Sequence, residues 1–175
     1  MQADTARAKC DPLASLNIHK WAEFSPCRRY RYALWRTWNI ALPQVLFIAL
    51  NPSIADEQRD DPTLRRCMAY ARAWGYGGVC VGNLFAVVSS DPRLLSAHTD
   101  PVGAGNDDWL IKLQFDVTIT LAAWGNRGFY LNRADTVVKM LPILHCLGVT
   151  KTGEPLHPLY QSADLEPRVY QRGVI

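Results

Sequence analysis

The sequence lacks a long apolar run, since its longest apolar stretches fall well short of the roughly 18 residues that suggest a membrane-spanning helix. The initial segment MQADTARAKCDPLA has no apolar core behind a basic stretch, so we expect no secretory signal. No P-loop, GxGxxG turn, GxSxG elbow or HExxH pair occurs. These absences give no support to membrane insertion or to the enzyme classes that those motifs mark.

Cysteine is sparse, odd in number and without a CxxC pair: Cys10, Cys27, Cys67, Cys80 and Cys146. This spacing gives little support to an iron–sulfur cluster, which needs four converging thiolates. We expect Cys67, Cys80 and Cys146 to be buried apolar thiols. A reducing cytoplasm fits this pattern best, and we expect neither a metal nor a cofactor.

The 175 residues suffice for one domain, and 49% of them are apolar and 20% charged, as in soluble globular proteins. We expect residues 1–26 to form a partly ordered N-terminal lead-in and residues 27–175 a single α/β domain. The net charge of +3 permits nucleic-acid binding without arguing strongly for it.

Apolar runs alternate with amphipathic segments along this domain. The pattern predicts strands at 28–38, 44–50, 78–85, 117–124 and 146–149, and helices at about 62–74, 106–115 and 133–144. Alternation of this kind predicts a three-layer α/β/α sandwich with a mainly parallel central sheet. The carboxyl ends of four strands then lie along one edge, where open α/β folds bind ligands.

Polar residues follow these strand ends at Asn51, Asn83, the Trp124–Gly128 turn and His157. We therefore expect one composite crevice. Asn51-Pro52-Ser53 ends the strand over 44–50, either as a ligand-binding motif or as a turn signal, since Asn-Pro commonly opens loops.

Three carboxylates, Asp56, Asp60 and Asp61, come next. They either bind a metal or activate water, or else Asp61 caps a helix and the others are solvated. No EF-hand spacing is present, so a metal is not expected.

Asn83 interrupts an apolar strand, where an unpaired amide is costly, and its donor–acceptor pair suits a nucleobase edge. Phe85 offers a stacking face or belongs to the core. His157 lies between Pro155 and Pro158, which fix the backbone and present an imidazole suited to hydrogen bonding or proton transfer near neutral pH.

Six segments together resemble a bacterial and phage family, domain-of-unknown-function family 1643. They are CRRYRYALWRTW, ALNPSIADEQRDDPTLRRC, NLF, DPVGAGNDDWL, AAWG and LGVTKTGEPLHPLY, and the resemblance covers roughly residues 26–160. The family name itself carries no activity.

A more distant resemblance is to the uracil-DNA glycosylase superfamily. It implies that Asn51 and Pro52 match the motif that positions the attacking water, and that Asn83 reads the base edge. His157 and Pro158 match the motif that stabilises the departing base, followed by Leu159 and Tyr160 as a wedge. Trp124 and Gly125 match the intervening glycine turn. The chain departs from that pattern at Ala49-Leu50 and Leu159, and in its aspartate cluster, which puts uracil itself in doubt.

The resemblance implies a DNA glycosylase-like enzyme that hydrolyses the N-glycosidic bond of a damaged or modified base. Asn51, His157, Asp56 and Asp61 are then catalytic, and Ser53 joins the base-binding set with Phe85. Four arginines are candidates for contacts with the DNA backbone, although charged helix faces usually meet solvent: Arg65, Arg66, Arg127 and Arg133. The alternatives are a nucleoside- or nucleotide-processing enzyme and a non-catalytic nucleotide- or protein-binding domain on the same fold.

Overall fold

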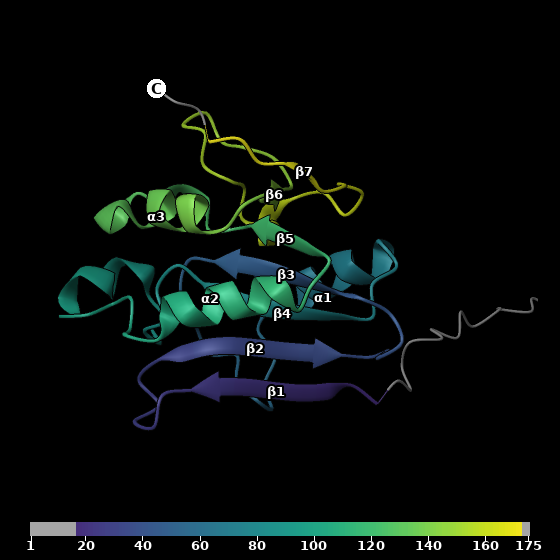
Figure 1. Cartoon of the computed structure of the whole chain (residues 1–175), viewed down its shortest axis with the longest axis horizontal. Helices are drawn as coiled ribbons and strands as arrows, with labels where there is room; N and C mark the ends of the chain where they lie inside the picture. Colours follow the sequence, from purple (N-terminus) through teal and green to yellow (C-terminus); the bar gives the residue numbers. More distant parts are fainter. Residues whose placement is uncertain (1–16, 173–175) are drawn as a thin grey trace, which may run out of the picture.

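A computed structural model describes residues 17–172 and contains one seven-stranded sheet in the order β1-β2-β4-β3-β5-β6-β7 (Figure 1). The strands are β1 (His19–Phe24), β2 (Arg31–Thr37), β3 (Gln44–Ala49), β4 (Gly78–Asn83), β5 (Ile119–Ala122), β6 (His145–Cys146) and β7 (Arg168–Val169). Cys10 lies outside the described residues. Cys67, Cys80 and Cys146 are buried, as predicted.

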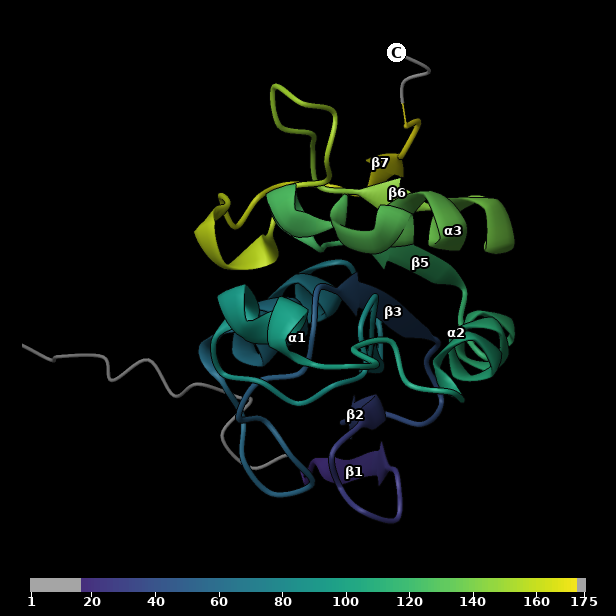
Figure 2. The same cartoon turned by 90° about the vertical axis from the view of Figure 1, so that its left-hand side faces the viewer.

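Helices cover both faces of the sheet: α1 (Pro62–Ala73) lies on one, and α2 (Asn106–Phe115) and α3 (Arg133–Met140) lie on the other. Figure 2 shows α1 and α2 on opposite sides of the strands. Short 3₁₀ turns complete the domain: η1 (Pro92–Ala97), η2 (Gly125–Arg127), η3 (Tyr130–Asn132) and η4 (Pro158–Tyr160). The chain is thus a mixed α/β domain.

Local sequence explains the elements that frame the site. The middle of β3, Val45 to Ile48, is buried because both faces of this strand meet helices. Helix α1 begins where the Asp61 side chain accepts the Leu64 amide and Pro62 supplies a fixed φ. It ends before Gly75, whose φ of +82° favours glycine.

The sheet is mixed, which corrects the expectation of a mainly parallel one. Three pairings are parallel (β4/β3, β3/β5, β5/β6), but β1/β2, β2/β4 and β6/β7 are antiparallel. The connection between β1 and β2 spans only residues 25–30, too short for the crossover that parallel strands need. Strand β1 itself lies within the segment expected to be a lead-in, and its largely exposed side chains explain why no apolar pattern marked it.

Two elements end earlier than the sequence pattern indicates. Helix α3 stops at Met140 because Leu141 precedes Pro142 and takes an extended conformation. Strand β6 pairs at only two residues, after which positive φ at Gly148 turns the chain. The remaining residues of the expected strand, up to Val149, belong to the loop that carries His157.

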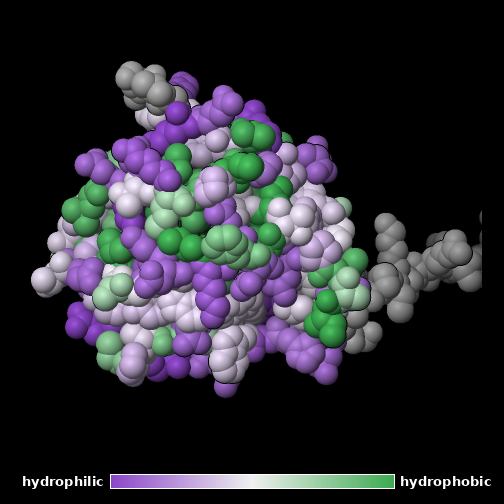
Figure 3. Space-filling model, in the orientation of Figure 1, coloured by the Kyte–Doolittle hydropathy of each residue, from purple (hydrophilic) through white to green (hydrophobic). Residues whose placement is uncertain are grey.

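The face seen in Figure 3 mixes polar and apolar side chains, with apolar residues gathered near its middle. Exposed apolar residues on the α2 and α3 side include Ile111, Phe115 and Ile143, which border a shallow hollow. Among residues 17–172, no helix combines the length and apolar character needed to cross a membrane.

Candidate functional site

A cavity of about 440 Å³ lies between α1 and the sheet, at the carboxyl ends of β3, β4 and β5. Figure 2 looks toward this edge of the sheet. The volume falls within the range of about 300–1,000 Å³ typical of small-molecule sites. Nine of the residues singled out from the sequence line it: Asn51, Ser53, Asp61, Asn83, Trp124, His157, Pro158, Leu159 and Tyr160.

Asn51 is held in one orientation by its own amide. Its Nδ2 donates to the carbonyl of Pro52 at 2.9 Å and to that of Ser89 at 2.8 Å. Because both N–H groups are used, the side-chain oxygen is the polar atom that Asn51 offers to the cavity. An acceptor fixed in this way is suited to orienting a water molecule or a ligand N–H.

Asn83 is the last residue of β4 and pairs in register with Ala49 at the end of β3. It is 1% exposed, and neither its side-chain oxygen nor its nitrogen has a hydrogen-bond partner. An unpartnered buried amide costs roughly 1–3 kcal/mol. Since the side chain borders the cavity, a ligand with one donor and one acceptor would satisfy both of its atoms.

His157 precedes the 3₁₀ turn η4, and its Nδ1 accepts the Leu159 amide at 3.4 Å. Burial lowers the pKa of His157, and the Asp61 carboxylate opposes that shift. A neutral imidazole that accepts at Nδ1 carries its proton on Nε2. His157 is therefore a donor through Nε2.

The two aspartates expected to be catalytic have different positions. Asp61 caps α1, with Oδ1 accepting the Leu64 amide at 2.7 Å, and it also lines the cavity. Asp56 does not line it, because its Oδ1 closes a turn by accepting the amides of Gln58 and Arg59. The structure therefore does not bring Asp56 together with the other residues expected to be catalytic.

Three residues expected to bind substrate lie beside the cavity rather than in its lining. Pro52 is buried and its carbonyl accepts from Asn51 and Ser89. Gly125 has a φ of +69°, and a Cβ there would lie 3.6 Å from the Cβ of His157. Phe85 packs in the core of the α2 and α3 side, with its ring 5.6 Å from Tyr130, so it cannot stack on a cavity ligand.

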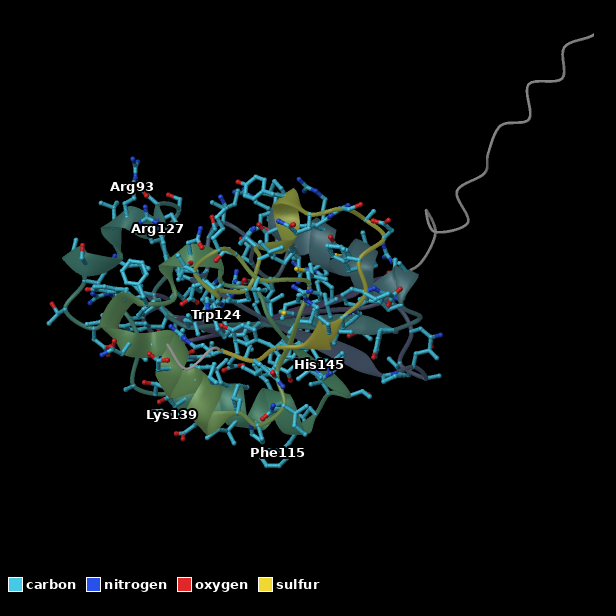
Figure 4. The ribbon with its side chains drawn as sticks, turned by 90° about the horizontal axis from the view of Figure 1, so that it is seen from above. Arg93, Phe115, Trp124, Arg127, Lys139 and His145 are labelled. Atoms are coloured by element: carbon cyan, nitrogen blue, oxygen red, sulfur yellow. The ribbon has the colours of Figure 1, made fainter. Side chains whose placement is uncertain are left out.

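The four arginines expected to contact phosphate also differ. Arg133 is 4% exposed and bonds the Leu84 carbonyl and Asp107, which corrects its proposed role. Arg66 bonds the Gln161 carbonyl and so ties α1 to the segment after η4. Arg65 and Arg127 are exposed. Figure 4 shows Arg127 near Arg93, whose partner Asp91 lies in the loop before η1.

Several cavity residues were not predicted as site residues from the sequence, and two of them, Arg31 and Cys67, carry groups that can ionise. Arg31 begins β2, and because β2 is antiparallel to β4 its first residue lies at the carboxyl end of β4. Burial lowers the pKa of Arg31 to about 10, opposed mainly by Asp61, so the guanidinium stays charged at neutral pH. Cys67 of α1 also lines the cavity, but burial raises the pKa of its thiol, which makes it a poor nucleophile.

Trp124 lines the cavity, and a hydrogen bond to Glu154 fixes its orientation. Its indole N–H donates to Glu154 at 2.8 Å, and Glu154 also pairs with Arg172. Glu154 comes from the loop between β6 and η4, the same loop that carries His157. This contact fixes the loop after β5 against the loop after β6.

Within residues 17–172, no group of three or more His, Cys, Asp or Glu side chains is placed to hold a metal ion. The chemistry that the lining offers is hydrogen bonding by Asn51, Asn83 and His157, beside one carboxylate and one guanidinium.

No curated protein and no solved structure matches the chain. Residues 31–159 match the family described as "Protein of unknown function (DUF1643)". This match spans well over half of the chain and runs from the start of β2 into η4, so it includes every residue that lines the cavity except Tyr160. The chain belongs to the DUF1643 family.

Proposed function

We propose that the chain is a DNA glycosylase-like enzyme that hydrolyses the N-glycosidic bond of a damaged or modified base. The observation that carries the proposal is that Asn51, Asn83 and His157, from three separate segments of the chain, line one cavity. An acceptor for water, a donor–acceptor pair for a base and a neutral donor for a leaving group are then available together. We also propose that the fold is related to that of uracil-DNA glycosylases.

Binding begins with extrusion of the target base from the stack, at a cost of a few kcal/mol. The base edge pairs with the carboxamide of Asn83, satisfying its two unpartnered atoms. Tyr160 is 80% exposed at the rim, with its ring 5.7 Å from that of His157. It therefore serves with Leu159 as the wedge that fills the gap in the stack.

Cleavage breaks the bond between the sugar carbon and the base nitrogen, and the bonding electrons leave with the base. His157 donates a hydrogen bond from Nε2 to the base as negative charge develops there. The carboxylate of Asp61 favours the positive charge that develops on the sugar. Asn51 accepts a hydrogen bond from the water that attacks the sugar carbon. This water loses one proton to solvent and the departing base takes up one from solvent, so the products are the free base and a sugar hydroxyl. The exposed Arg65 and Arg127 contact phosphates.

The test is incubation of the full chain with single- and double-stranded DNAs that carry a panel of modified bases. Released bases are identified by mass spectrometry, and abasic sites by alkali cleavage. Asn51→Ala and His157→Ala should each lower the rate of base release by about 10²–10³-fold, as losses of positioned polar groups do.

Matched controls are Asn17→Ala and His19→Ala, since both residues are exposed and distant from the cavity lining. These two variants should keep the wild-type rate. If no base is released from any DNA in the panel and no DNA is bound, the proposal is wrong.

A further inference from the structure

Three arginines of the described domain are buried, and two of them pair with a carboxylate and donate to backbone carbonyls. Arg36 donates to the Asp60 carboxylate and to the carbonyls of Trp35, Asp56 and Arg59. Arg133 donates to the Leu84 carbonyl and pairs with Asp107. These contacts follow the general rule that a buried charge is paired and hydrogen-bonded.

Arg31 does not follow that rule. It is 3% exposed, its Nη1 donates to the Ala55 carbonyl, and its buried Nε has no partner. It forms no ion pair with any carboxylate of residues 17–172. One carbonyl is a poor counterpart for a guanidinium that offers five donors in a planar fork.

The side chain of Arg31 borders the cavity that Asn83 also borders. Apolar groups of Leu34, Phe47 and Val81 line the same space and offer no counter-charge. Asp61 is the carboxylate of the lining, but its Oδ1 is committed to the start of α1. The unused donors of Arg31 are therefore available to a ligand in the cavity.

We propose that the natural ligand of this cavity carries an oxyanion that pairs with Arg31 while its base edge pairs with Asn83. The inference rests on the proposed function and deepens it, because it names the substrate class as a base or nucleotide with a negative group. A carboxylate on the base and a phosphate on the sugar share this chemistry, since both match the guanidinium fork in two parallel hydrogen bonds.

Two matched pairs of probes show whether ligand charge raises affinity, and whether the cavity prefers a carboxylate on the base or a phosphate on the sugar. The first pair is 5-carboxyuracil and thymine, which differ at one position by a carboxylate against a methyl group. The second pair is uridine 5′-monophosphate and uridine. Affinity of the full chain for each probe is measured by calorimetry at fixed ionic strength, so that general attraction to a basic protein stays constant.

We expect the charged member of one pair to bind at least tenfold more tightly than its neutral partner. Arg31→Met should abolish that preference, and Arg31→Lys should keep part of it because the charge remains. A preference within the first pair assigns the oxyanion to the base, and one within the second pair assigns it to a phosphate. Chemical denaturation of each variant checks that the fold is intact.

The inference is wrong if charged and neutral partners bind equally, if none of the four probes binds, or if the preference survives in Arg31→Met. These outcomes are separate from the fate of the proposed function. Base release from DNA without any preference for charge would leave the glycosylase proposal standing and remove the role of Arg31. Tight binding of an oxyanion without base release from any DNA would do the reverse.

Discussion

Buried polar groups on the two sides of the sheet are treated differently by the surrounding protein. On the α2 and α3 side, Asn106 donates to the carbonyls of Asn83 and Leu84, and Arg133 bonds Leu84 and Asp107. On the α1 side, the side chain of Asn83 has no partner and Arg31 has one. The α2 and α3 side also holds an unpartnered atom, Oδ1 of Asn106, but Asn83 and Arg31 differ from Asn106 in lining the cavity.

The difference teaches that burial alone does not mark a functional residue. Arg36 lies on the same strand as Arg31 and is 0% exposed, yet its guanidinium is saturated by the loop over 56–60. What distinguishes Arg31 and Asn83 is unused hydrogen-bonding capacity beside empty space. Substitution of a buried polar group that is paired within the protein should therefore lower the free energy of unfolding clearly. Substitution of Arg31 or Asn83 should lower it little or raise it.

The largest expected effect is at Arg36. Arg36→Met should lower the free energy of unfolding by about 3 kcal/mol, because Asp60 keeps only Lys20 as a partner and several part-buried carbonyls lose their donor. Arg31→Met removes a single hydrogen bond and should lower it by no more than about 1 kcal/mol. Urea denaturation of both variants measures this contrast, and equal losses would contradict it.

A second contrast lies within the asparagines. Asn83→Leu should raise the free energy of unfolding by roughly 1–3 kcal/mol, because the variant no longer buries two unsatisfied polar atoms. Asn106→Leu should lower it by a similar amount, since two buried carbonyls lose their donor. Thermal and urea unfolding give the sign, and destabilisation by Asn83→Leu would mean that the amide is satisfied within the fold.

Asp61 both caps α1 and lines the cavity, and two substitutions separate these roles. Asp61→Ala should lower the free energy of unfolding by about 1 kcal/mol through loss of the helix cap. Asp61→Ser keeps a capping oxygen and should restore most of that stability while removing the charge from the cavity. If base release falls in Asp61→Ser although stability is retained, the carboxylate acts in the reaction as well as in the fold.

The smallest expected effect is the pH dependence that His157 adds to stability. Burial lowers its pKa in the folded chain, so the unfolded chain binds the proton more readily. The contribution is fully present above the unfolded value of about 6.5 and declines as pH falls toward the lowered pKa. The free energy of unfolding, measured between pH 5 and 8, should thus decrease more steeply toward low pH for wild type than for His157→Gln. Parallel curves would mean that His157 is not desolvated.

Local pattern was enough to predict much of the architecture and of the cavity lining. The apolar runs predicted β3 and β4, α2 was predicted over 106–115, and Asp61 was one of two candidate starts for α1. The polar residues after those strands, Asn51, Asn83 and His157, line one space. Periodicity and turn chemistry are local properties, which is why the sequence carries them.

Pairing partners were not predictable in the same way. The antiparallel entry of β2 beside β4 depends on contacts between distant residues, so Arg31 looked like one more basic residue on a polar strand face. For the same reason the sequence left Phe85 open between stacking on a ligand and packing in the core, and made Arg133 a candidate for contacts with the DNA backbone. Both are buried on the opposite side of the sheet. Which face a strand-end residue meets depends on register, and one residue of shift reverses it.

The antiparallel course of β2 separates the sources of the cavity's polar groups. Asn51 and His157 come from loops and Asn83 from the last residue of β4, whereas Arg31 is the first residue of β2, which follows the turn after β1. Substitutions in the β1/β2 hairpin can therefore change the charged group of the cavity without altering the segments that carry Asn51, Asn83 and His157. In the proposed function, the group that recognises ligand charge and the groups that act in bond breaking therefore come from separate parts of the chain.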